Sequence, residues 1–127
     1  MITLKRAYDP AASGDGKRFL VERLWPRGIR KASLQIDEWL KEVAPSAELR
    51  QWFSHDPAKW PKFRDRYFRE LDANPQACQT ILVAAARGGN VTLIHSSHDT
   101  EHNNAVALRD YLDKKLQKHG IHSRKCA

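Results

Sequence analysis

The chain has 127 residues, of which 41% are hydrophobic and 29% are charged, and its formal net charge is +7. This balance excludes an intrinsically disordered chain and leaves room for one modest hydrophobic core. There is no apolar run long enough for a membrane span and no signal-peptide pattern, so no membrane partner is expected. Cys78 and Cys126 lack the spacing of a metal site or a disulfide framework. We therefore expect a single-domain protein of the reducing cytoplasm.

The positive charge is concentrated at the two ends of the chain. Residues 1–31 carry eight basic and three acidic side chains, and residues 113–127 carry five basic and one acidic. We expect the C-terminal excess to be solvated, with residues 121–127 forming a flexible basic tail. The N-terminal excess lies among apolar residues and therefore matters more for function.

Two strands are predicted in the first thirty residues. Ile2 to Arg6 alternates apolar and polar side chains, and Tyr8-Asp9-Pro10 ends this strand. The turn signal Asp15-Gly16 precedes a second strand at Phe19-Leu20-Val21. Pro26-Arg27-Gly28 closes the segment.

Helix signals dominate the middle of the chain. Ser33 is predicted to cap a helix whose buried face holds Ile36, Trp39, Leu40 and Val43. Further helix starts are indicated at Ser46, Asp56-Pro57 and Asn74-Pro75, and Gly88-Gly89 is predicted to end the last of these helices.

The rest of the chain is expected to be organised around residues 91–112. Val91-Thr92-Leu93-Ile94 is a short apolar run typical of a buried central strand. Asp99 or Thr100 is predicted to cap the following helix, whose buried stripe includes Ala105 and Leu108. In open α/β sheets, the loop between the carboxyl end of a strand and the next helix is where ligands bind.

The order of these elements predicts the fold class. We expect an α/β protein with a small, mostly parallel sheet flanked by helices, and with a helical insertion between the second and last strands. Residues 1–120 are predicted to form the single domain. Three strands make a thin sheet, so an additional edge strand could be present.

Arginines beside aromatic residues form the first candidate site. If the first two strands are parallel neighbours, these side chains meet at one edge of the sheet. An arginine presents a planar donor fork that matches phosphate or carboxylate, and it also stacks on rings. This predicts a basic, aromatic-walled pocket for an anion; the alternative is that the arginines pair with acidic residues and only hold loops. The ligand-binding candidates are Arg6, Tyr8, Arg23, Trp25, Arg27 and, from the helical insertion, Arg50.

The polar loop after the predicted central strand forms the second candidate site. His102 can act as a general acid or base near neutral pH, assisted by Asp9 or Asp99. Ser96 and Asn103 could bind or orient a substrate, although no nucleophile-elbow glycines surround Ser96. The alternative is that His102 and Asn103 only tie the loop together.

The spacing of His95, His98 and His102 invites a zinc interpretation. His95 belongs to the end of a strand, where side chains alternate between faces, so the three imidazoles cannot be assumed to converge. Neither a metal nor another cofactor is predicted. Aromatic residues at helical spacing, such as Trp60 and Phe63, are assigned to the core rather than to a stacking surface for nucleic acid.

Several short motifs resemble a known family. They are Arg6-Ala7-Tyr8-Asp9, Arg23-Leu24-Trp25-Pro26-Arg27-Gly28, Ala44-Pro45-Ser46, Glu48-Leu49-Arg50-Gln51-Trp52-Phe53, Glu70-Leu71 and His102-Asn103-Asn104-Ala105. With these motifs, the chain resembles the YeaO-like branch of the bacterial domain of unknown function 488 family. The resemblance implies a small, cytoplasmic, bacterial α/β protein, and it carries no established activity.

Three hypotheses about function follow from the sequence. The leading one is binding of a small anionic molecule, such as a nucleotide or a sugar phosphate, with His102 as acid or base if a reaction occurs. The second is a nucleic-acid-binding module that uses the basic N-terminal region and tail. The third is a non-catalytic interaction protein in which the arginines brace the fold. The sequence leaves the oligomeric state open.

Overall fold

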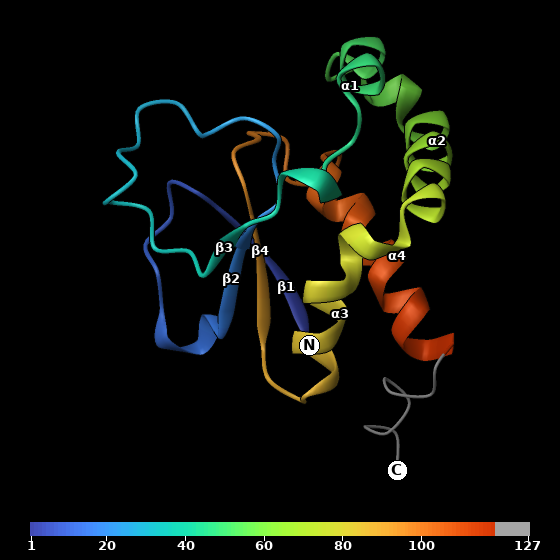
Figure 1. The fold of residues 1–127 in the computed structure, drawn as a ribbon. Coiled ribbons are helices and arrows are strands. Elements are labelled where there is room, and N and C mark those ends of the chain that lie inside the picture. Colours follow the sequence, from blue (N-terminus) through green and yellow to red (C-terminus); the bar gives the residue numbers. More distant parts are fainter. Residues whose placement is uncertain (119–127) are drawn as a thin grey trace.

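The computed structural model describes residues 1–118, so the predicted tail at 121–127 lies outside the described residues. A four-stranded, all-parallel sheet with the order β1-β4-β2-β3 forms one layer, and helices form a second (Figure 1). The predicted α/β class with a parallel sheet is confirmed. The strands are β1 (Ile2–Arg6), β2 (Lys17–Leu20), β3 (Glu38–Trp39) and β4 (Val91–His95).

Strand β4 is central, as its apolar sequence predicts. All five of its residues are buried, and it pairs with β1 on one side and with β2 on the other. The first two strands of the chain are therefore parallel but not neighbours. Alternation along β4 directs Val91 and Leu93 to the main core, whereas Ile94 packs on the opposite face.

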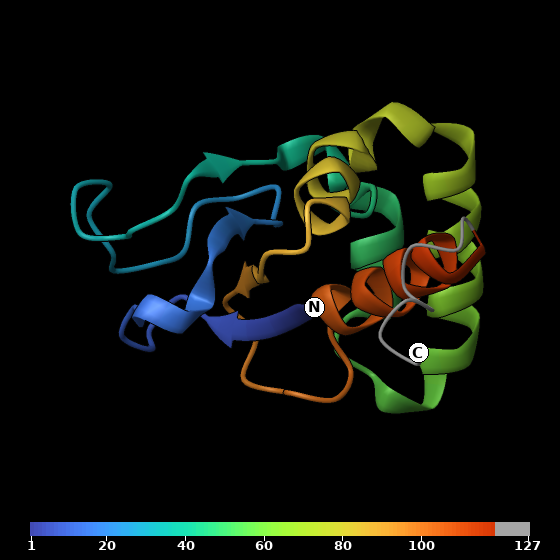
Figure 2. The ribbon, with the colours of Figure 1, turned by 90° about the horizontal axis from the view of Figure 1, so that it is seen from below.

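The helices cover one face of the sheet (Figures 1 and 2). They pack on Phe19 and Leu93 of the sheet, and Tyr67 and Phe63 are the largest fully buried side chains of this core. The helices are α1 (Ala47–Phe53), α2 (Trp60–Ala73), α3 (Gln79–Ala86) and α4 (Asn104–Lys118), with 3-10 turns η1 (Ser13–Asp15), η2 (Lys41–Val43), η3 (Pro57–Lys59) and η4 (Pro75–Cys78). Ser46 caps α1 as predicted, because its side chain accepts a hydrogen bond from the Leu49 amide.

The other face of the sheet is covered by the long connection between β2 and β3 rather than by helices. This loop extends away from the helical layer in both ribbon views. Its residues Trp25, Leu34 and Ile36 pack against Leu20 and Ile94 and form a second, smaller core. The rings of Trp25 and Trp39 meet edge to face, with their centroids 5.3 Å apart.

The helix predicted from Ser33 is wrong. The segment forms the short edge strand β3 and the turn η2 instead. The Asp37 amide donates to the Arg18 carbonyl and the Leu40 amide donates to the Leu20 carbonyl, at 2.7 and 2.8 Å. Pairing with β2 therefore satisfies the backbone that a helix would have satisfied internally.

No helix within residues 1–118 combines the length and the apolarity that a membrane span requires.

Candidate functional site

The carboxyl ends of β1, β2 and β4 lie at the same edge of the parallel sheet, and Arg6 is the last residue of β1. The Arg6 Nε donates to the Ser97 carbonyl at 3.0 Å, and its Nη2 lies 3.3 Å from His98 Nδ1. The Arg6 Cζ sits 4.9 Å from the centroid of the Tyr8 ring. We call Arg6, Tyr8 and His98 the Arg6 rim.

Two further predicted residues join the Arg6 rim through the backbone. The Tyr8 hydroxyl donates to the Arg27 carbonyl at 3.0 Å, which fixes the loop that carries the exposed Arg27 side chain beside the rim. The Asp9 carboxylate accepts from the Arg6 amide at 3.2 Å. Asp9 therefore shapes the turn after β1.

His95, the last residue of β4, is paired with Arg6 of β1 in the sheet, and it is buried. Burial, together with the positive charge of Arg6, lowers the pKa of His95 to about 4, while Asp9 opposes the shift. The Ser97 amide donates to the neutral ring at Nδ1, at 3.2 Å. His95 is thus a neutral support beneath the Arg6 rim.

The loop between β4 and α4 is held by Asp99. Its Oδ1 accepts from the amides of Glu101 and His102, both at 2.9 Å, and its Oδ2 lies 3.1 Å from His102 Nδ1. The two amide hydrogen bonds are the main reason that the pKa of Asp99 is lowered. The half-buried His102 ring also meets Trp60 edge-on, with centroids 5.4 Å apart.

The predicted cap of α4, at Asp99 or Thr100, is wrong by four or three residues. The helix begins at Asn104, and the Asn103 side chain accepts from the Val106 amide at 3.0 Å. The Asn103 amide group also donates to the Asp99 carbonyl at 2.7 Å. The Asp99 carboxylate is occupied by its own turn, so Asn103 takes the capping position instead of Asp99 or Thr100.

Ser96 is engaged by a residue that sequence reasoning did not place in the site. Its hydroxyl donates to Glu22 Oε1 at 2.6 Å, which links the ends of β4 and β2. The spacing of 74 positions between the two residues offers no local signal for this pair. The serine hydroxyl therefore has a carboxylate acceptor, but no imidazole partner among the described residues.

The structure does not bring Arg23 and His102 into the same pocket. Arg23 lines a cavity beside Tyr67 and Glu70, and its Nη2 donates to the Ala44 carbonyl at 3.4 Å. His102 instead contacts Trp60, the first residue of α2. Trp60 and Glu70 are separated by about 15 Å along the helix axis.

The two remaining predicted residues, Trp25 and Arg50, form no hydrogen bond with the Arg6 rim within the described residues. Trp25 packs in the smaller core, and its indole donates to the Ile29 carbonyl at 2.7 Å. Arg50 lies in the last turn of α1, where its Nε is buried and has no hydrogen bond to the described residues. The predicted single pocket is therefore divided: the Arg6 rim adjoins the β4–α4 loop through Ser97 and His98, whereas Arg23 lies in the cavity beside α2.

The three closely spaced histidines have separate partners. His95 accepts from Ser97, His98 lies against Arg6, and His102 lies against Asp99. Within residues 1–118, no three histidine, cysteine or acidic side chains gather closely enough to hold a metal ion.

Comparison with known proteins identifies the family. A sequence profile described as the inactive DUF488-N3 subclade matches residues 1–126. The chain belongs to this family. The DUF488-N3 match confirms the resemblance to domain of unknown function 488, and it includes every residue of the Arg6 rim and of the cavity beside α2.

Two bacterial proteins are similar to this chain along most or part of its length. The Escherichia coli K12 protein named Uncharacterized protein YeaO is 44% identical over 111 residues, which cover 87% of this chain and 96% of YeaO. Uncharacterized protein Rv3073c of Mycobacterium tuberculosis H37Rv is 44% identical over 70 residues, or 55% of this chain and 59% of that protein. No solved structure matches the chain.

Proposed function

We propose that this DUF488 protein binds a small phosphate-bearing molecule at the Arg6 rim without transforming it. The observation that carries the proposal is the placement of Arg6 at a strand end. Its guanidinium is held by the Ser97 carbonyl and lies over the Tyr8 ring. A guanidinium fixed in this way offers its donor fork to an anion at little further cost in side-chain entropy.

The surroundings of the Arg6 rim favour a nucleotide-like ligand. Tyr8 is 45% exposed, so part of its ring is open for stacking on a base. The exposed Arg27 side chain belongs to the loop fixed by Tyr8, and residues 1–31 carry an excess of positive charge. A phosphate on Arg6 would thus be placed in a positive field.

Binding without catalysis is supported by the description of the subclade as inactive. The partners of the predicted catalytic groups agree with it. Ser96 is hydrogen-bonded to Glu22 rather than to a base, and Asp99 is engaged by two backbone amides. His102 retains the capacity for acid–base chemistry, so an assay for hydrolysis of the bound nucleotide tests this part of the proposal.

Titration of the ¹⁵N-labelled protein with pyrophosphate and with AMP tests the proposed function. Both probes should shift the amides of residues 6–9 and 96–99. Arg6→Gln should weaken both by about ten- to a hundredfold, because a hydrogen bond to a charged group contributes about 1.5–3 kcal/mol. Tyr8→Leu should weaken the binding of AMP and leave the binding of pyrophosphate unchanged. Arg69→Gln, at an exposed arginine of α2 paired with Asp65, is the matched control.

If neither pyrophosphate nor AMP shifts these amides, or if Arg6→Gln binds both with the affinity of the parent protein, this function is rejected.

A second candidate, nucleic-acid binding, is favoured by Trp52, since Arg66 Cζ and Lys59 Nζ lie 4.3 and 5.1 Å from its ring centroid. This candidate predicts that the protein binds a single-stranded oligonucleotide at about 50 mM salt and that the affinity falls steeply as the salt concentration rises.

We also propose a cytoplasmic location, which the free thiol of Cys78 favours.

A further inference from the structure

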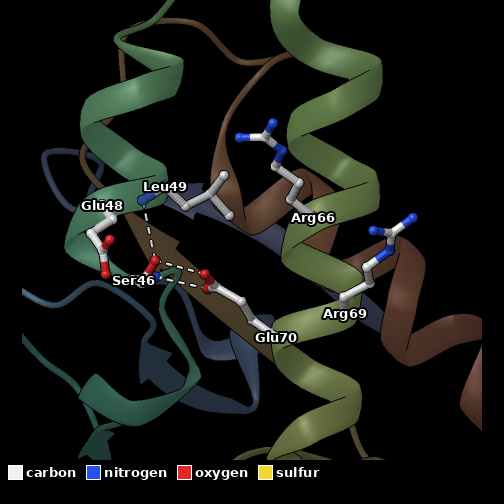
Figure 3. Close-up of a pocket in the computed structure, with 6 residues that line it drawn as sticks. All are labelled: Ser46, Glu48, Leu49, Arg66, Arg69 and Glu70. Atoms are coloured by element: carbon white, nitrogen blue, oxygen red, sulfur yellow. Dashed lines mark hydrogen bonds between the residues drawn. The ribbon is translucent and has the colours of Figure 1, made fainter.

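A cavity of about 160 Å³ lies between the segment after β3 and the C-terminal half of α2. It opens beside a shallower depression of about 310 Å³ that runs between α1 and α2, and the two share Ser46 and Glu70 (Figure 3). The polar side chains of the inner cavity are Arg23, Glu42, Ser46, Tyr67, Glu70 and Asn74. Neither this cavity nor its lining takes part in the proposed binding at the Arg6 rim.

Arg23 is under-satisfied in the wall of this cavity. Its Nε is buried and finds no hydrogen bond among the described residues, and the contact of its Nη2 with the Ala44 carbonyl is long, at 3.4 Å. A buried donor without a partner costs free energy, and a charged one costs more. Because the buried Nε is closed off from the cavity, a bound carboxylate would reach Arg23 through its two Nη groups, of which only Nη2 has a hydrogen bond to the described residues.

Two carboxylates face the same cavity without neutralising Arg23. Glu70 accepts from the backbone amide and the hydroxyl of Ser46, and Glu42 is exposed at the cavity's edge. Within residues 1–118, neither forms an ion pair with Arg23. A carboxylate has about four acceptor sites, so Glu70 keeps capacity beyond its two bonds to Ser46. Within the described residues, positive and negative groups thus line one small space without forming an ion pair with each other.

We propose that this cavity binds a small zwitterion of the amino-acid class. The ligand carboxylate lies on the Arg23 fork, and its ammonium group lies toward Glu42 and Glu70. The two charges of the ligand complement the positive and negative groups of the cavity wall. A simple anion or a simple cation complements only one of them. The cavity is smaller than the sites of about 300–1,000 Å³ that hold drug-sized molecules, which restricts the ligand to a few heavy atoms.

Binding is tested on the full chain with L-alanine as the probe and with acetate and methylammonium as its two halves. Saturation-transfer NMR should detect L-alanine at millimolar concentration. The amide shifts that it causes should centre on Ala44, Ser46 and Asn74. Each half-ligand should bind at least about tenfold more weakly than L-alanine. Absence of L-alanine binding, or shifts that centre elsewhere, would overturn the proposal.

Variants then separate the two charges. Glu42→Gln should weaken the binding of L-alanine by about tenfold and leave the affinity for acetate unchanged. Arg23→Gln should abolish the binding of both. Glu48→Gln, at an exposed position that lines only the outer depression, should have no effect. If Arg23→Gln fails to fold, the Glu42→Gln result decides, because Glu42 is exposed. Equal L-alanine affinity in Glu42→Gln and the parent protein would contradict the assignment. Arg6→Gln should retain L-alanine binding, so the two sites are tested independently.

Discussion

Ser46 donates both its backbone amide and its hydroxyl to the Glu70 carboxylate, at 2.9 and 2.6 Å (Figure 3). The same hydroxyl accepts from the Leu49 amide at 3.1 Å. One serine therefore caps α1 and also joins the start of α1 to the side of α2. This junction forms one wall of the cavity beside α2.

The first prediction concerns the energetic coupling of Ser46 and Glu70. Ser46→Ala removes a helix cap and a partner of Glu70, and should lower the free energy of unfolding by about 1–3 kcal/mol. Glu70→Gln should cost less because the amide oxygen still accepts one bond. In the double variant the losses should not add, with a coupling of about 0.5–3 kcal/mol by urea denaturation. Additive losses would show that the junction is not a unit, and Glu48→Gln is the control without a bond to Ser46.

The cap at Ser46 could be predicted from sequence, whereas its bond to Glu70 could not. A serine before an apolar helical pattern is a local signal, and so are the alternation of Ile2–Arg6 and the apolar run of β4. The partner of Ser46 is 24 positions away on another helix. Its identity depends on how α1 and α2 pack, which no short window of sequence contains.

Segment 33–43 shows why local patterns can mislead. Apolar residues at 36, 39, 40 and 43 fit a helical stripe, but they are divided between two cores in the structure. Val43 is buried in the core beneath the helices, while Ile36 and Trp39 pack with the loop on the other face. Pairing with β2 therefore overrides the helical period.

The candidate site was only partly predictable, because local sequence does not determine how distant elements are arranged. Arg6, Tyr8 and Asp9 lie together because β1 and its turn are short and local, and the Tyr8 hydroxyl holds the Arg27 backbone beside them. Arg23 follows β2 but turns toward α2, and the loop that follows carries Trp25 into a core. The position of β4 between β1 and β2 separates Arg6 from Arg23, and strand order is not encoded in the spacing of the motifs.

The second prediction concerns acid stability and Asp15. Its carboxylate accepts from the Ala12 amide, from Lys5 Nζ at 3.0 Å and from Arg18, and these partners lower the pKa of Asp15 to about 2. The stabilisation is complete above the ordinary pKa of about 3.8 and is lost as the pH falls toward 2. Asp15→Asn should remove this part of the pH dependence of unfolding. Asp65→Asn, at an exposed helix position, should leave it unchanged.

The third prediction concerns the backbone at Gly16. Gly16 has φ of +65°, and a Cβ added there would overlap the carbonyl oxygen of Asn90. Because both the conformation and the contact exclude a side chain, Gly16→Ala should cost more than about 2 kcal/mol of unfolding free energy. The matched control is Gly14→Ala, since nothing lies within 4 Å of a Cβ at that position. Similar thermal unfolding of the two variants would contradict the close approach of η1 to the turn before β4.

The fourth prediction concerns His95 beneath the Arg6 rim. The pKa of His95 is lowered from 6.5 to about 4 by burial and by Arg6, so the folded ring stays neutral. As the pH falls below 6.5, the unfolded chain binds a proton that the folded chain does not, and stability decreases until the pH nears 4. The loss is of the order of 3 kcal/mol, because one pKa unit corresponds to about 1.4 kcal/mol.

His95→Gln should flatten the dependence of unfolding free energy on pH between 6.5 and 4, measured by urea denaturation across that range. The exposed His55 supplies the control, and asparagine is the appropriate replacement because His55 has φ of +58°, which asparagine tolerates. His55→Asn should retain the slope of the parent protein. An unchanged slope in His95→Gln would mean that the ring is protonated in the fold. A charged ring beside Arg6 would then have to be compensated by Asp9, so Asp9→Asn should lower stability further at pH below 6.5 in that case only.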